Sequence, residues 1–215
     1  MADSEKIKVV VADDHEMVRA GIRRLLADAE DIEVVGEAES GEEAVRHFFT
    51  HEPDVLIMDL SMPGMSGLES MRRILQRQPL ARIIVLSMRE DVVYPKRVIQ
   101  AGAKGYLTKR TAPEALLRAV REVAKGEVFL EREIAQKVAL NGIAGDREVF
   151  GELSEREFEV FIMLAEGQTV TAIAKALFLS PKTVGTYQTR IMHKLDVHNA
   201  AGLARLAIRN GLIQA

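Results

Sequence analysis

The chain has 215 residues, a length that suits two domains, so we expect two separate hydrophobic cores. Hydrophobic residues make up 47% and charged residues 28%, an ordinary globular composition that excludes a long disordered tail. There is no cysteine, which excludes disulfides, thiolate metal sites and cysteine nucleophiles, and a formal net charge of −3 neither requires nor forbids a nucleic-acid partner.

Short β-branched runs alternate with helical periods from Ile7 to about Lys125. The runs are nearly continuous in apolar character, as in strands covered on both faces, which predicts a parallel sheet with helices on each side. The five expected strands are residues 7–12, 32–38, 54–60, 82–87 and 104–108. We therefore predict an α/β doubly wound five-stranded parallel sheet with a flavodoxin-like order.

The second half of the chain has no such runs and predicts a small all-α domain. An acidic stretch with two glycines close together, residues 127–150, has the composition of a linker. Beyond it Ser154 and Glu157 have the spacing of a capping box, and Ser180 before Pro181 opens a further helix. The expected division is residues 1–126, a linker at 127–150, and a helical domain at 151–215.

Three carboxylates lie at the carboxyl ends of predicted strands. Asp13 and Asp14 follow the first strand, and Asp59 ends the third. Ligands of open α/β sheets bind at this edge, so the three should converge on one site. Clustered carboxylates raise each other's pKa unless a cation offsets their charge, and hard oxygen ligands favour Mg²⁺.

Two further polar side chains should reach the same edge: Ser87 at the end of the fourth strand and Lys109 after the fifth. Together these groups could hold a phosphoryl group on a carboxylate. Asp59 would attack, Mg²⁺ and Lys109 would neutralise charge, and Ser87 would hydrogen-bond the product. A single aspartate at a strand end is more often a cap for the next turn, but joint placement at four strand ends favours the functional interpretation.

The segments ADDH at 12–15, MDLSMPGMSG at 58–67 and GYLTK at 105–109, with Ser87, resemble the receiver domain of two-component response regulators. The resemblance implies that Asp59 is the phosphoacceptor. It also implies a Mg²⁺ site formed by Asp14, Asp59 and the backbone carbonyl of Ser61, with Asp13 acting through water.

The same resemblance implies a switch pair. Ser87 would be the switch hydroxyl, and Tyr106 the aromatic residue that rotates inward with it. Because a tyrosine on an edge strand is commonly a packing residue, simple packing of Tyr106 stays an alternative.

Residues 169–195 have the pattern of a helix-turn-helix. One apolar face is expected from Ala172, Ile173, Ala176 and Leu177, and a second from Val184, Tyr187, Ile191 and Leu195. No acidic residue occurs between Glu166 and Asp196, whereas four basic residues do. The near-neutral chain therefore contains a local basic surface, which suits phosphate contact but also a plain solvated helix face.

The stretch from LSEREFEV to HKLDV resembles the LuxR-type effector domain, so the whole chain is similar to the NarL/FixJ class and, within it, to the GacA/UvrY branch. By that resemblance the residues near the base edges are Gly185, Thr186 and Thr189. Thr186 and Arg190 are expected to read bases, and Lys182, Thr183 and Lys194 to hold phosphates. The helix at 199–209 would be a dimerisation surface or a cap on the helical core.

We predict a response regulator, not an enzyme. A sensor histidine kinase would phosphorylate Asp59, and a homodimer would bind double-stranded DNA. The alternatives are a phosphatase, in which a second acid would be expected where Ser61 stands, a helical domain that binds protein, and a regulator that binds DNA unphosphorylated. The sequence shows no cleavable apolar segment and no apolar stretch of bilayer length, so we expect a cytoplasmic protein without a membrane partner.

Overall fold

The computed structural model describes residues 6–88, 93–136, 150–210 and 212–213. The chain forms two compact units that divide after Gln136, and each unit buries its own set of apolar side chains. Most of the expected linker, residues 137–149, lies outside the described residues. The functional boundaries at 126 and 151 stay predictions.

The first unit is a parallel sheet in the order β2-β1-β3-β4-β5-β6. Its strands are β1 (Ile7–Ala12), β2 (Ile32–Ala38), β3 (Val55–Asp59), β4 (Ile83–Ser87), β5 (Gly105–Thr108) and β6 (Phe129–Leu130). The first five lie within one residue of the predicted runs, and every residue of β3, β4 and β5 is buried. The prediction of a doubly wound parallel sheet is confirmed.

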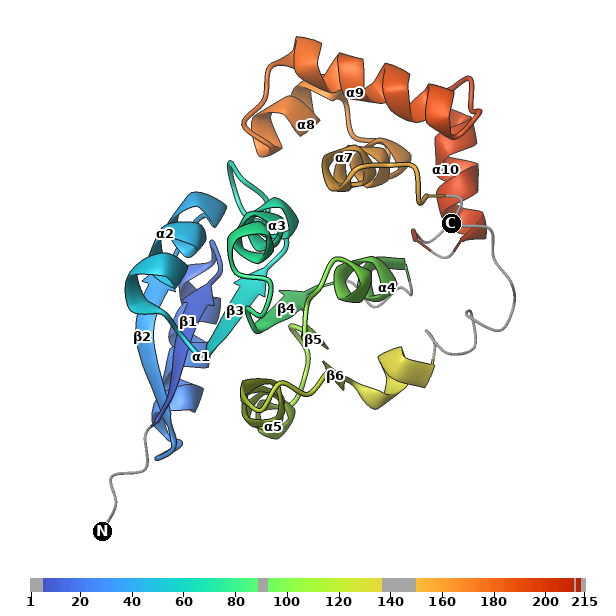
Figure 1. Ribbon diagram of the computed structural model, residues 1–215. Helices are drawn as coiled ribbons and strands as arrows, with labels where there is room; N and C mark the ends of the chain where they lie inside the picture. Colours follow the sequence, from blue (N-terminus) through green and yellow to red (C-terminus); the bar gives the residue numbers. More distant parts are fainter. Residues whose placement is uncertain (1–5, 89–92, 137–149, 211, 214–215) are drawn as a thin grey trace. The chain divides into compact units, whose positions relative to one another are not determined.

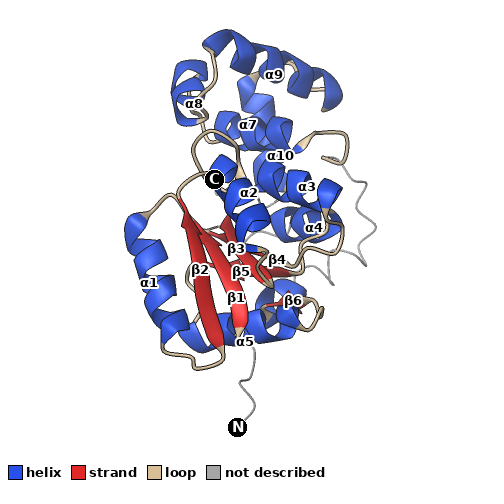
Figure 2. Cartoon of the chain, turned by 60° about the vertical axis from the view of Figure 1, so that its left-hand side comes forward, coloured by secondary structure: helices blue, strands red, loops and turns tan. Residues whose placement is uncertain are grey.

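Helices cover both faces of the sheet, as Figures 1 and 2 show: α1 and α5 lie on one face, and α2, α3 and α4 on the other. The helices are α1 (Glu16–Ala27), α2 (Gly41–His51), α3 (Gly67–Arg77), α4 (Val93–Gln100) and α5 (Pro113–Ala124). One core joins the apolar faces of α1 and α5 to the sheet. Because both sheet faces are covered, polar groups can gather only at the strand ends.

The sheet has a sixth strand that the sequence analysis did not predict. Leu130 pairs with Tyr106, and the backbone N–H of Phe129 donates to the carbonyl of Lys104 at 2.8 Å. Phe129 is buried, with the Arg118 guanidinium 5.1 Å from its ring centroid. The expectation of five strands was therefore wrong. β6 was missed because a run of two residues gives no periodic signal in the sequence. One consequence is that β5 is not an edge strand.

The described residues of the second unit form four helices: α7 (Glu155–Ala165), α8 (Val170–Ala176), α9 (Pro181–Lys194) and α10 (Ala200–Arg209). The predicted capping box is confirmed, since Ser154 and Glu157 each accept a hydrogen bond from the other's backbone N–H. Ser180 accepts from the N–H of Thr183 and starts α9 with proline in its first turn, as predicted. No described helix has both the length and the apolar character needed to span a bilayer.

Candidate functional site: an acidic cluster and a basic helix

The predicted carboxylates do meet at one edge of the sheet. β1 and β3 are neighbours, although the chain between them forms β2 on the other side of β1, so the strand order reverses here. Asp13 follows β1 and Asp59 is the last residue of β3. Such a reversal opens a crevice at the strand ends, where α/β proteins bind ligands.

Lys109 joins the two buried carboxylates. Its Nζ lies 2.7 Å from Oδ2 of Asp59, to which it donates a hydrogen bond, and 2.7 Å from Oδ2 of Asp13. All three side chains are at most 9% exposed. The backbone N–H of Lys109 donates to the carbonyl of Ser87 at 2.9 Å, so β4 and β5 together place the ammonium group.

These contacts perturb both partners. Burial raises the pKa of Asp59, and the charge of Asp13 adds to the rise, while Lys109 opposes it. Burial disfavours the charged form of Lys109, but contacts with Asp13 and Asp59 outweigh burial and raise the pKa of Lys109. Perturbed acids and bases in a crevice are typical of functional sites.

The cluster also fits a divalent cation. One ligand atom from each of Asp13, Asp14, His15 and Asp59 lies within 4.8 Å of the others. Oδ2 of Asp13 is buried, and its contact is the ion pair with Lys109 at 2.7 Å. Carboxylate oxygens in this number suit a hard cation such as Mg²⁺ better than a soft metal. Ser61 lies beside the cluster and donates its backbone N–H to Oδ1 of Asp59 at 3.2 Å.

His15 is a member of this cluster that the sequence analysis did not single out. Its Nδ1 lies 2.9 Å from Oδ1 of Asp14 and 3.3 Å from Oδ1 of Asp13, and its backbone N–H donates to Oδ1 of Asp13. The side chain is 64% exposed. Its position directly after two aspartates at a strand end was the available signal.

The expected switch residues are both buried. Ser87 ends β4 at 3% exposure, and Tyr106 in β5 is fully buried between its strand neighbours Val85 and Leu130. The ring of Tyr106 is therefore already turned inward in this structure. Since β6 flanks β5, Tyr106 does not lie on an edge strand, but its full burial is also what a packing residue would show, so its switch role stays a prediction.

Gly67 closes the loop that follows Asp59. A Cβ atom at Gly67 would overlap the backbone carbonyl of Asp59, and the Gly67 N–H donates to the carbonyl of Leu60 at 3.1 Å. Only glycine permits α3 to start this close to the end of β3. Gly67 therefore helps to fix the backbone of Asp59.

In the second unit, α9 offers an exposed polar face. Val184 and Ile191 are buried, and the residues expected to contact DNA lie elsewhere on the helix. Lys182, Thr186, Thr189 and Arg190 are exposed, and Thr183 and Gly185 are half-buried. A Cβ at Gly185 would meet no atom within 4 Å, so the space beside this part of α9 is open.

The apolar face expected for α8 needs correction, and Lys194 has a partner that the sequence did not indicate. Lys194 was expected to hold a phosphate, but its Nζ lies 2.6 Å from Oε2 of the buried Glu157 and donates to the carbonyl of Glu152 at 2.9 Å. Folding the chain back between α7 and α9 creates this pair. The structure buries Ile173 and Ala174 of α8 and its C-cap residue Leu177, whereas Ala172 and Ala176 are exposed.

The family of the chain follows from these two units. Residues 9–121 match the response regulator receiver domain, and residues 151–207 match the bacterial regulatory proteins of the luxR family. The chain therefore belongs to the response regulators that combine a receiver domain with a LuxR-type domain. The resemblances inferred from its motifs are confirmed.

Individual relatives show which members of this class the chain is similar to. The chain is 45% identical to Response regulator UvrY of Escherichia coli K12 over 211 residues, which are 97% of each chain. It is 42% identical to Response regulator GacA of Pseudomonas aeruginosa over 211 residues, covering 97% of this chain and 99% of that one. Among solved structures, the chain is similar to RcsB of Salmonella enterica serovar Typhimurium bound to promoter P1flhDC in the presence of the phosphomimetic BeF3⁻. The two are 32% identical with a TM-score of 0.68, and the match covers 98% of this chain and 100% of that one.

Proposed function

We propose that this response regulator accepts a phosphoryl group on Asp59 from a sensor histidine kinase and controls transcription by binding double-stranded DNA through α9. The observation that carries the proposal is the ammonium group of Lys109, which lies 2.7 Å from the carboxylates of both Asp13 and Asp59. A cation held at a buried aspartate can offset the charge that an incoming phosphoryl group brings.

The transfer requires a nucleophilic carboxylate. An oxygen of ionised Asp59 attacks the phosphorus of a phosphohistidine; a P–O bond forms, the P–N bond breaks, and the imidazole leaves. Lys109 neutralises charge beside the new phosphoryl group. Asp13, Asp14 and Asp59, with the backbone carbonyl of Ser61, would hold Mg²⁺, which supplies further positive charge at the phosphoryl oxygens.

The same geometry argues against a stand-alone phosphatase. Such an enzyme needs a general acid to protonate its leaving group, and the position two residues after Asp59 is occupied by Ser61. Ser61 contacts Asp59 through its backbone N–H. We therefore propose a regulator rather than an enzyme, with the hydroxyl of Ser87 and the ring of Tyr106 as the groups that respond to the phosphoryl group.

The DNA contacts follow from the exposed face of α9. Lys182 and Thr183, at the start of the helix, would hold phosphates, where the helix N-terminus also favours negative charge. The hydroxyls of Thr186 and Thr189 already donate to backbone carbonyls of their own helix at 3.0 Å. They would therefore offer acceptor lone pairs and methyl groups to base edges, and Arg190 would supply the donors.

Lys194 would have to exchange its contact with Glu157 in order to hold a phosphate. Gly185 would allow a close approach of the helix backbone to the groove, since the space beside it is open.

We further propose a homodimer that places two copies of α9 in successive major-groove turns. Leu203 and Ala207 of α10 are buried within the unit, whereas Ile208 is 38% exposed on another side of the helix. One helix could therefore complete the core and still offer a contact to a second copy. A cytoplasmic location, where a kinase domain and DNA are both accessible, is part of the same proposal.

The test is DNA binding by the wild type and by Asp59→Asn, each with and without acetyl phosphate and Mg²⁺, on genomic fragments selected by the wild type. We expect the phosphodonor to strengthen binding by the wild type and to leave Asp59→Asn unchanged. If both proteins bind DNA and neither responds, the receiver does not control binding. If the wild type selects no fragment, or if its binding does not weaken steeply with salt, the proposal that α9 contacts DNA phosphates is wrong.

A further inference from the structure

Arg19 is a buried cation close to the acidic cluster. It lies on α1, and its side chain is only 8% exposed. Arginine stays charged at all relevant pH values and is almost never buried without partners, because removing its charge from water is costly. Its contacts should therefore reveal what it holds in place.

The guanidinium connects two loops at the carboxyl edge of the sheet. Nη1 donates to the backbone carbonyl of Asp13 at 2.6 Å, and Nη2 donates to Oε1 of Glu39 at 2.6 Å. Asp13 lies in the β1–α1 loop, and Glu39 in the β2–α2 loop. One planar, rigid group thus spans both loops, which a flexible ammonium group cannot do.

The carboxylate of Asp13, the residue whose carbonyl Arg19 holds, makes two further contacts. Oδ1 of Asp13 accepts the backbone N–H of His15, and Oδ2 points toward Lys109. Fixing the backbone of Asp13 fixes the direction from which its carboxylate enters the cluster. We propose that Arg19 is a positioning residue that holds the β1–α1 loop in the geometry needed for divalent cation binding by the acidic cluster.

The inference rests on the proposed cation site and goes beyond it, because Arg19 itself contributes no ligand atom. Groups that do not touch the metal but orient its ligands through hydrogen bonds contribute strongly to metal binding. Their loss typically weakens metal affinity by about 10- to 100-fold.

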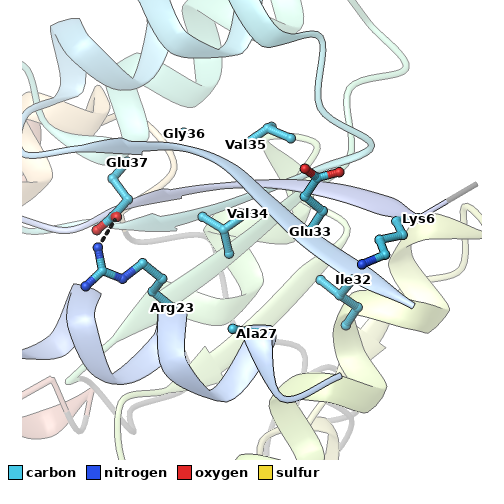
Figure 3. A pocket seen from close by; sticks show the side chains of 9 residues that line it. All are labelled: Lys6, Arg23, Ala27, Ile32, Glu33, Val34, Val35, Gly36 and Glu37. Carbon is cyan, nitrogen blue, oxygen red and sulfur yellow. Dashed lines mark hydrogen bonds and ion pairs between the residues drawn. The ribbon is translucent and has the colours of Figure 1, made fainter. Parts of the chain in front are cut away.

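Arg23 provides a matched control on the same helix. Figure 3 shows it beside β2, where its Nη1 contacts Oε1 of Glu37 at 3.0 Å. Glu37 also lies 3.8 Å from Nε of Arg19, so both arginines share one acidic neighbour. Arg23 is 58% exposed, however, and no hydrogen bond joins it to Asp13 among the described contacts. Arg23→Lys therefore makes the same chemical change on α1 as Arg19→Lys, with the positive charge kept, and leaves the β1–α1 loop held.

The experiment measures binding of Mn²⁺, a spectroscopic substitute for Mg²⁺ with similar preference for oxygen ligands, to the unphosphorylated full-length chain. The loss of the electron paramagnetic resonance signal of unbound Mn²⁺ gives the dissociation constant. The wild type is compared with Arg19→Lys and Arg23→Lys, and thermal unfolding in EDTA shows that each variant is folded. We expect Arg19→Lys to raise the dissociation constant about 10-fold and Arg23→Lys to leave it unchanged.

Each outcome decides a separate point. If the wild type binds no Mn²⁺, the proposed cation site itself is wrong. If the wild type binds and Arg19→Lys binds equally well, the site stands and the inference about Arg19 is overturned. If Arg19→Lys does not fold, Glu39→Gln decides, since it loosens the guanidinium from a side chain that is 71% exposed: weaker Mn²⁺ binding supports the inference, and unchanged binding overturns it.

Discussion

Replacing Lys109 by methionine would leave two buried carboxylates without their shared cation. Methionine keeps much of the length of the side chain and removes only the charge. Breaking a buried ion pair by removing one partner costs about 3–5 kcal/mol. We expect the lower end, a loss of about 3 kcal/mol of unfolding free energy at pH 7.5, because one of the two carboxyl groups can take up a proton.

That proton gives the prediction its pH dependence. In Lys109→Met the pKa of Asp59, already raised by burial, has no ammonium group left to oppose the rise. A carboxyl group whose pKa is higher in the folded than in the unfolded state contributes stability that is complete below the unfolded pKa and is lost as pH rises through the folded pKa. One proton is worth about 1.4 kcal/mol per pH unit of pKa difference, so the deficit should shrink as the pH falls from 7.5 to 5.5.

Urea denaturation followed by circular dichroism at both pH values, with EDTA present, measures this difference. Lys125→Met is the control, since Lys125 is exposed and its loss should change stability by at most about 0.5 kcal/mol. A deficit for Lys109→Met that is equal at pH 5.5 and pH 7.5 would refute the reasoning, because it would mean that packing rather than charge holds the site together.

Three further predictions concern single positions. Glu157→Gln should lower the unfolding free energy by about 2 kcal/mol at neutral pH. Burial opposes ionisation of Glu157, but Lys194 and the cap at Ser154 outweigh burial and lower its pKa. Its contribution is therefore present above the ordinary glutamate pKa and is lost as the pH falls through the lower folded pKa, which denaturation at pH 7 and pH 3 would show. Phe178→Asn should raise the melting temperature, since Phe178 is 70% exposed with a φ of 53°, a conformation that asparagine tolerates better. Gly67→Ala should lower the unfolding free energy by about 1–3 kcal/mol and slow phosphorylation by acetyl phosphate, because the alanine Cβ would overlap the backbone of Asp59. Wild-type behaviour of the variant in either assay would show that the loop relaxes.

The strands and the acidic cluster could be predicted from the sequence because both depend on local order. A buried parallel strand is a nearly continuous apolar run, and the residue after it must lie at the edge of the sheet, so Asp13, Asp59 and Lys109 followed from their positions alone. β6 could not be predicted, since two residues carry no period and only the neighbouring β5 makes them a strand.

Two basic residues show a different limit of the sequence. In a linear pattern Lys194 looks like one more charge on a basic helix, and Arg19 like a polar residue on an amphipathic one. Their partners, Glu157 and the backbone of Asp13, are set by how helices and loops pack. Whether a basic side chain faces solvent or closes a buried contact is decided by tertiary structure, which the spacing of residues does not record.

The charges at the strand ends indicate how a phosphoryl group on Asp59 would be felt elsewhere. Lys109 is the ammonium group shared by Asp13 and Asp59, and a phosphoryl group would exchange one negative charge for a larger one on longer bonds. A single ammonium group cannot keep both contacts at 2.7 Å when one acceptor moves outward, so it must follow the phosphoryl oxygens or stay with Asp13. A shift of the ammonium group would be passed along the side chain toward the backbone of Lys109, whose N–H is bonded to the carbonyl of Ser87. This backbone hydrogen bond would give the charge state of Asp59 a route to the end of β4 that does not need the hydroxyl of Ser87.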